Sequence, residues 1–169
     1  MAASAHASPT TNARAAAAIR SHHAELTGAL QQAVTTLLDA VDGGDPAGIR
    51  DATEHVVGWC ERELLPHAAA EEETLYPAAA SQEPARLLIT SMTAEHELIS
   101  RLVRELAASD RPISSVATAG ALQVVFASHV GKENDLVLPL LESASGTGLA
   151  DLLEAMHHRN PTPRENPVS

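Results

Sequence analysis

The chain has 169 residues and a mass of 17.7 kDa, which is the size of one ordinary domain. Apolar residues make up 44 % of it and aromatic residues only 2 %. Because this alanine-rich mixture favours helices, an all-β domain is nearly excluded. Twenty-two acidic residues against 11 basic ones give a net charge of −11, which argues against binding to nucleic acid or to an anionic membrane surface.

Residues 1–12 are rich in Ala, Ser and Thr and contain no long apolar run, so we expect a disordered leader rather than a signal peptide. No unbroken run of apolar residues reaches the length of a membrane span, and we expect no transmembrane helix. Cys60 is the single cysteine, so the fold cannot depend on an internal disulfide. Together these features predict a cytoplasmic protein.

Apolar residues recur at spacings of three and four from Ala13 to about Val41, which predicts a first helix. The Asp-Gly-Gly run at 42–44 ends it, and Asp45 before Pro46 is typical of the start of the next helix. Pro66 lies inside that second helix, where it predicts a kink or a local break, and Pro77 is expected to end or bend the helix. The inward face of the second helix carries Ile49, Thr53, Val56, Cys60, Leu64, His67, Glu71 and Leu75.

Pro84 opens a third helix, and Ser114 or Ser115 begins a fourth. The predicted inward residues are Ile89, Met92, His96, Ile99, Val103 and Leu106 in the third helix, and Leu122, Phe126, His129, Glu133, Leu136 and Leu140 in the fourth. Residues 143–158 predict a loop and one short amphipathic helix, and the proline-rich tail 159–169 is expected to be disordered. The whole pattern predicts an all-α protein, with an antiparallel up-and-down four-helix bundle over residues 13–142.

Each of the four inward faces contains a histidine, and an up-and-down bundle would bring the four rings within about 8 Å of one height. In the second and fourth helices the histidine starts a repeated pattern, in which a glutamate follows four residues later and a proline six residues after that. The two copies are His67, Glu71 and Pro77, and His129, Glu133 and Pro139. Residues i and i+4 share a helix face, so an imidazole and a carboxylate can reach the same metal ion or two adjacent ones. The pattern therefore indicates an internal metal site.

The alternative is that these histidines are hydrogen-bonded core residues. Six buried polar groups would each cost free energy without partners, which favours the metal site. His23 continues the apolar stripe of the first helix while His22 is rotated off it, so His23 is the favoured ligand. Glu72 and Glu73 are expected to form a solvated acidic face. Tyr76 is the single tyrosine, and a phenol close to a metal could have a function.

Other site types fit the sequence less well. The Glu-x-x-His pattern of ferritin-like diiron proteins occurs only at Glu154 and His157, in the short terminal helix. A zinc-protease pattern begins at His96, but Ser100 stands where its second histidine belongs. His55 lies about 18 Å along the helix from His67, too far to share its metal, and Cys60 is expected to be a buried apolar residue. His6, His157 and His158 are placed in the leader or on the surface.

The motifs at His23, at His67 to Pro77, at Glu95-His96 and at His129 to Pro139 resemble the hemerythrin-like (HHE cation-binding) domain family over about residues 15–142. The resemblance implies an antiparallel four-helix bundle that holds two iron ions joined by an oxo or hydroxo bridge. It also implies that the metal ligands are His23, His67, Glu71, His96, His129 and Glu133, with the two glutamates as bridges.

Oxygen-carrying hemerythrins have a further histidine one turn after the position of His96, where this chain has Ser100. The six implied ligands and a bridging oxygen therefore leave two coordination positions open, where the carriers leave one. We expect a protein that binds or senses O2, NO or peroxide. The alternative is a diiron enzyme with catalase-like, peroxidase-like or NO-reducing activity. The sequence does not identify a protein partner.

Overall fold

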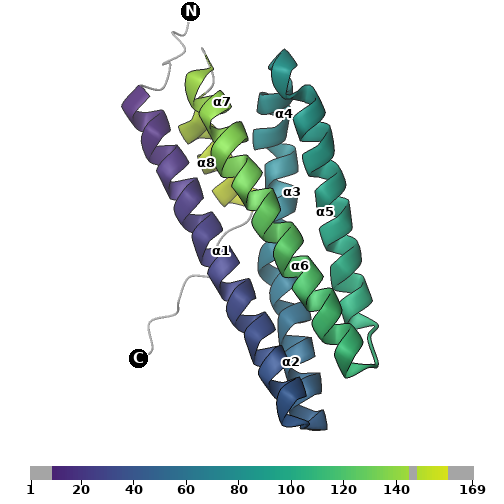
Figure 1. Ribbon diagram of the computed structural model, residues 1–169. Helices are drawn as coiled ribbons and strands as arrows, with labels where there is room; N and C mark the ends of the chain where they lie inside the picture. Colours follow the sequence, from purple (N-terminus) through teal and green to yellow (C-terminus); the bar gives the residue numbers. More distant parts are fainter. Residues whose placement is uncertain (1–8, 145–147, 160–169) are drawn as a thin grey trace, which may run out of the picture.

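The computed structural model describes residues 9–144 and 148–159, and within these ranges it contains helices and no strand. The predicted all-α class is therefore confirmed. In Figure 1 the chain runs along α1, returns through α2, α3 and α4, runs back along α5 and returns through α6 and α7. The short helix α8 packs against α1 and α3. The bounds are α1 Pro9–Gly43, α2 Pro46–Trp59, α3 Leu65–Glu73, α4 Leu75–Ala80, α5 Arg86–Ala107, α6 Pro112–Lys132, α7 Leu138–Ser143 and α8 Leu149–Arg159.

Several helix ends lie where the sequence places them. Helix α1 ends at Gly43, and Gly44 follows with φ +66°, a backbone conformation that glycine adopts without a steric penalty. The Asp45 side chain accepts hydrogen bonds from the backbone N–H groups of Ala47 and Gly48, each at 3.1 Å, and so caps α2 as predicted.

Other helix ends differ from the predictions. Helix α1 begins at Pro9 rather than at Ala13, because Asn12 is buried and its Oδ1 accepts a hydrogen bond from the backbone N–H of Leu149. The predicted leader is therefore wrong for residues 9–12, and residues 1–8 lie outside the described part of the chain. Helix α6 begins at Pro112, and a 3-10 turn at Glu83–Ala85 precedes α5. Arg159 ends α8, and the rest of the predicted tail, residues 160–169, also lies outside the described residues.

Two π-helical turns, at Cys60–Leu64 and Glu133–Val137, each stand just before a proline. The N–H of Leu65 bonds the carbonyl of Cys60, and that of Leu138 bonds the carbonyl of Glu133, so each turn holds one extra residue. Pro66 and Pro139 come two residues after the last residue of each turn, and a proline has no N–H to continue the hydrogen-bond ladder. The break expected at Pro66 is such a turn. The interruption expected at Pro77 falls earlier, at Thr74, and the helix continues to Ala80.

The second π turn corrects the predicted inward face of the fourth helix. Leu136 is 51 % exposed and Leu140 is half-buried, whereas Val137, Leu138 and Leu141 are buried. The extra residue after Glu133 rotates the following helix, so that the apolar stripe moves one position along the chain.

By length and composition alone, the continuous helical segment Pro112–Ser143 is apolar enough to cross a membrane, since an 18-residue window within it has a mean hydropathy of 1.4. Polar residues such as Gln123 and His129 interrupt its apolar residues, so it contains no unbroken apolar run. Core helices pass the same test, and this one packs against α1 and α5 with buried His129 and Glu133 on its inner face.

The core consists of two apolar clusters with a polar layer between them. One cluster contains Leu26, Leu64, Ile99 and Phe126, and the other contains Ile19, Leu75, Met92 and Val137. The helices form four rods, namely α1, α2 to α4, α5, and α6 with α7. In each rod the predicted ligand residues lie between a member of one cluster and a member of the other. The fold therefore gathers these polar side chains at one level and shields them from both ends.

Candidate metal centre

The six predicted ligands lie together in the polar layer. The α1 rod supplies one of them, the α2–α4 rod two, α5 one, and α6 with its π turn two. Every one of them is at most 5 % exposed: His23, His67, Glu71, His96, His129 and Glu133. The polar side chains that the sequence singled out are thus brought together and withdrawn from water.

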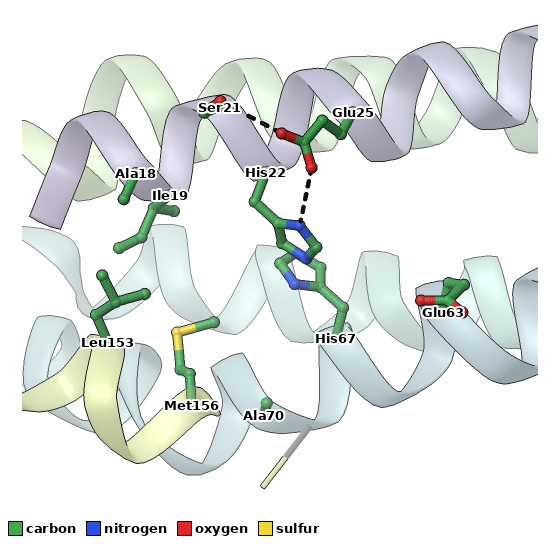
Figure 2. Close-up of a pocket in the computed structure, with 10 residues that line it drawn as sticks. All are labelled: Ala18, Ile19, Ser21, His22, Glu25, Glu63, His67, Ala70, Leu153 and Met156. Atoms are coloured by element: carbon green, nitrogen blue, oxygen red, sulfur yellow. Dashed lines mark hydrogen bonds and ion pairs between the residues drawn. The ribbon is translucent and has the colours of Figure 1, made fainter. Parts of the chain in front are cut away.

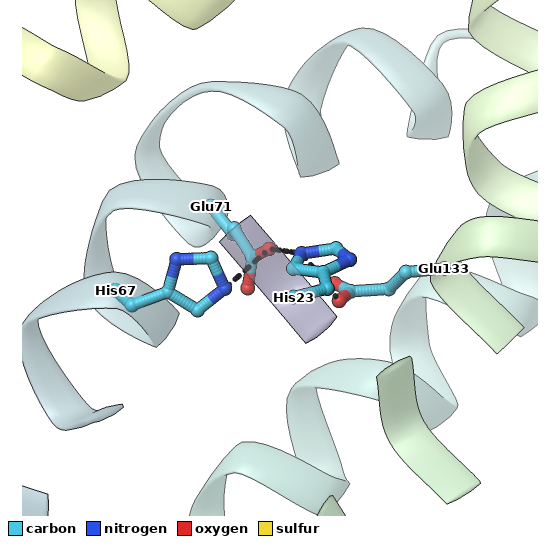
Figure 3. Close-up of side chains that lie close together, drawn as sticks. All are labelled: His23, His67, Glu71 and Glu133. Atoms are coloured by element: carbon cyan, nitrogen blue, oxygen red, sulfur yellow. Dashed lines mark hydrogen bonds and ion pairs between the residues drawn. The ribbon is translucent and has the colours of Figure 1, made fainter. Parts of the chain in front are cut away.

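These side chains form two groups that share both carboxylates. His23, His67, Glu71 and Glu133 make subsite 1, and Glu71, His96, His129 and Glu133 make subsite 2. Within each subsite the possible ligand atoms all lie within 4.8 Å of one another. Figure 3 shows subsite 1, with the rings of His23 and His67 directed at Glu71 and with the Glu133 carboxylate also beside His23 Nε2. Such a pair of subsites can hold two adjacent cations with Glu71 and Glu133 between them.

Unpartnered polar atoms in the polar layer support a metal site. Among the described residues, three buried side-chain atoms have no hydrogen-bond partner: His67 Nε2, Glu71 Oε2 and Glu133 Oε2. All three belong to the two subsites. His67 Nε2 lies 3.0 Å from Glu71 Oε1, but without hydrogen-bond geometry. Buried polar atoms of this kind are costly unless something satisfies them, and a cation would satisfy all three.

The protonation of the metal-free site follows from mutual contacts. Burial alone would lower the pKa of His23, but the hydrogen bond and charge of Glu71, with Glu133 and Asn134, raise it to about 9. Burial alone would raise the pKa of Glu71, yet His67 and His23 hold it well below its ordinary value. Without metal, protons on imidazoles balance the buried carboxylates, and a cation would replace those protons.

Tyr76, a minor candidate from the sequence, is buried, and its hydroxyl lies beside the ligand atoms of subsite 2. The hydroxyl donates a hydrogen bond to Glu133 Oε1 at 2.8 Å, and it lies 3.1 Å from His129 Nε2 and 3.3 Å from His96 Nε2. Burial and the negative charges of Glu133 and Glu71 raise the pKa of Tyr76. The phenol oxygen thus lies within 3.3 Å of a possible ligand atom on His96, His129 and Glu133, three of the four residues of subsite 2.

The outward nitrogens of three histidines also have partners. His23 Nδ1 lies 2.8 Å from Asn134 Oδ1, His96 Nδ1 lies 2.8 Å from Glu72 Oε1, and His129 Nδ1 lies 3.0 Å from Glu95 Oε2. Glu72 is exposed, as expected of a solvated acidic face, but its carboxylate also contacts the ring of His96. Glu95 also forms an ion pair with Lys132. Partners of this kind orient a metal-binding imidazole and select its tautomer.

His22 lies outside both subsites and lines a cavity of about 340 Å³ between α1, α3 and α8. Figure 2 shows its ring beside that of His67, and the two ring centres are 5.0 Å apart. Ile19, Leu153 and Met156 supply apolar walls, while Glu25 and Glu63 also line the cavity. The sequence did not predict this cavity, because α8 joins it from the far end of the chain.

The remaining candidates are not members of either subsite. Cys60 is fully buried, and burial with the charge of Glu61 raises the pKa of its thiol to about 12, which suits an apolar role. Ser100 lines a separate cavity of about 490 Å³ with His96 and Glu72. The predicted leader residue His6 is outside the described part of the chain, and His158 is exposed.

The hemerythrin HHE cation-binding domain family matches residues 14–141. The match spans the four rods and both subsites, and the chain therefore belongs to this family. Its buried cluster of histidines and glutamates is compatible with metal binding. A search of curated proteins and a search of solved structures each gave no match.

Proposed function

We propose that the chain binds two iron ions, joined by an oxo or hydroxo bridge, and uses them to bind or sense O2, NO or peroxide. The observation that carries the proposal is the pair of buried subsites that share Glu71 and Glu133. Two shared carboxylates let adjacent cations divide the negative charge, and a mixed set of imidazole and carboxylate donors suits iron. When bound, the iron pair would supply electron transfer to the small ligand.

The Tyr76 oxygen changes the number of open coordination positions. The six predicted ligands and one bridging oxygen leave two positions open on two six-coordinate ions. Tyr76 would occupy one of them, at subsite 2, because its hydroxyl lies among His96, His129 and Glu133. The remaining open position then belongs to subsite 1.

The cavity beside His67 gives a small ligand a route toward subsite 1. Its volume is about 340 Å³, and its lining combines the apolar side chains of Ile19, Leu153 and Met156 with the acidic residues Glu25 and Glu63. Carboxylates repel anions, and the apolar walls admit uncharged molecules at little cost. This cavity therefore favours neutral ligands such as O2, NO and hydrogen peroxide.

The test is metal analysis of the purified protein combined with an electronic spectrum. We expect about two iron ions per chain and absorption from a bridged diiron centre. His23→Ala should lower the iron content, while the matched variant His22→Ala should keep two ions, because only His23 lies in a subsite. Protein that takes up no iron, or a His22→Ala variant that loses iron while His23→Ala keeps it, would contradict the proposal.

An enzyme that turns over peroxide or reduces NO is the second candidate, and Tyr76 favours it. A phenol that donates a hydrogen bond to Glu133 at 2.8 Å is a source of a proton and of an electron at the site. Steady-state O2 release from hydrogen peroxide and NO consumption under reducing conditions distinguish the candidates. A binding protein gives a reversible spectral change without turnover, whereas an enzyme gives sustained turnover.

A further inference from the structure

The two subsites differ in what supports their histidines. In subsite 1 the outward nitrogen of His23 contacts a neutral amide, that of Asn134, at 2.8 Å, and the ring of His67 lines the cavity. In subsite 2 both histidines are supported by carboxylates, His96 by Glu72 at 2.8 Å and His129 by Glu95 at 3.0 Å. The inward ligand atoms do not reveal this difference, because each subsite has two imidazoles and the same two glutamates.

A carboxylate behind a histidine strengthens it as a ligand. It accepts the hydrogen bond from Nδ1–H, which fixes the ring with Nε2 directed inward and raises the basicity of that nitrogen. It also adds a negative charge a few ångströms from the place where a cation would bind. An amide accepts the same hydrogen bond without the charge. Subsite 2 therefore has the stronger pair of imidazole donors.

Both supporting carboxylates are held in place. Lys132 pairs with Oε1 of Glu95, which leaves Oε2 for His129, and the Glu95 side chain is 23 % exposed. Glu72 is 40 % exposed, but it extends from the same turn as Glu71 to the ring of His96 on α5. Glu72 thus connects α3 to the ring of His96 on α5, and Glu95 connects α5 to the ring of His129 on α6.

We infer that Glu72 and Glu95 are positioning residues that make the two metal subsites unequal, so that subsite 2 takes up the first divalent cation and subsite 1 the second. This inference rests on the proposed function, since it assumes that the cluster binds two cations. It concerns the order and strength of binding, which neither the ligand set nor the family defines. The inference identifies subsite 2 as the anchored position and subsite 1 as the one that empties first.

The experiment titrates the metal-free full-length protein with Zn²⁺, a redox-inert probe. Calorimetry measures the two binding steps, and NMR of the imidazole nitrogens shows which rings respond to each equivalent. We expect the first equivalent to shift the resonances of His96 and His129, and the second to shift those of His23 and His67. If His23 and His67 respond first, or if the two steps are equal in the wild type, the inference is wrong.

Matched variants test the role of the carboxylates. Glu95→Gln and Glu72→Gln keep the size of the side chain and an acceptor oxygen but remove the charge, and each should weaken the first step about 10- to 100-fold. The second step should change less than about threefold, and Glu97→Gln, at an exposed position of α5, should change neither step. Unchanged first steps in both variants would contradict the inference. Absence of any Zn²⁺ binding by the wild type would instead contradict the proposed function itself.

Discussion

Glu71 and Glu73 lie two residues apart on one helix, but only Glu71 contributes to the subsites. Glu71 is 1 % exposed and belongs to both subsites, whereas Glu73 is exposed. Glu71→Gln removes a buried charge shared by two cations, so we expect the metal content to fall from about two ions per chain to one or fewer. Glu73→Gln should retain both ions. Elemental analysis of the two variants checks this, and retention of two ions by Glu71→Gln would mean that the carboxylate does not bridge.

Tyr76→Phe tests whether the phenol oxygen binds metal. The ring is buried and would keep its packing, while the hydroxyl contact with Glu133 would be lost. We expect the variant to fold and to hold close to two ions per chain. If Tyr76 binds ferric iron in the wild type, tyrosinate bands appear in its resonance Raman spectrum and are absent from the variant. Identical spectra would show that the phenol only donates a hydrogen bond.

Residue spacing along one helix predicted some of the site residues and missed others. The i, i+4 pairs His67–Glu71 and His129–Glu133 are local, so helix periodicity was enough to place them on inward faces. Tyr76 follows a break at Thr74, where backbone dihedrals of −127° and −71° leave the helical range. A straight helix therefore gave no reliable direction for it. Glu72 and Glu95 act across rods, on His96 and His129, and such contacts have no signature in the spacing along one helix.

At the level of the helices, the π turn at Glu133–Val137 and a regular helix predict opposite effects on stability for substitutions at two neighbouring positions. Val137 is 1 % exposed and Leu136 is 51 % exposed, although an unbroken helical pattern places Leu136 inward. Val137→Ala should lower the free energy of unfolding by about 2 kcal/mol, since it leaves a cavity in the core. Leu136→Ala should change it by no more than about 0.5 kcal/mol, although it deletes more atoms.

Denaturant unfolding of the two variants measures this difference. A larger loss of unfolding free energy from Leu136→Ala than from Val137→Ala would show that the helix is regular there and has no π turn. The prolines did predict an interruption near Pro66, but the sequence carries no sign of which backbone solution follows. A kink, a break or one extra residue can each accommodate a proline that has no N–H to donate. Packing against the other helices determines which of the three forms.

Across the whole molecule, the polar layer between two apolar clusters concentrates opposing charges away from water. The helical class and several helix ends, among them the end of α1 at Gly43 and the cap of α2 at Asp45, could be predicted from sequence, because apolar periodicity and capping residues are local features. The position of α8 could not, since its contacts join Leu149 to Asn12 across the length of the chain. The packing of α8 also creates the cavity beside His67.

The charges of this polar layer predict that the metal-free protein becomes less stable as the pH rises. The contribution of bound metal to stability should change in the opposite direction. The pKa of His23 is raised to about 9 in the metal-free fold from an ordinary value of 6.5, and the pKa of His129 is also raised. A raised pKa stabilises the fold fully below the unfolded value and loses that contribution as pH rises through the folded value. Metal-free protein should therefore lose stability between pH 6.5 and 9, by on the order of 3 kcal/mol for His23.

Metal binding requires neutral imidazoles, so its contribution to stability should increase over the same range. Thermal unfolding with a chelator and with saturating Zn²⁺ should give melting temperatures that lie closest near pH 6 and separate as the pH approaches 9.5. In His23→Gln, which cannot take a proton there, the decline of the metal-free protein should be smaller. Parallel curves for the two forms would show that protons on the imidazoles do not balance the buried carboxylates when metal is absent.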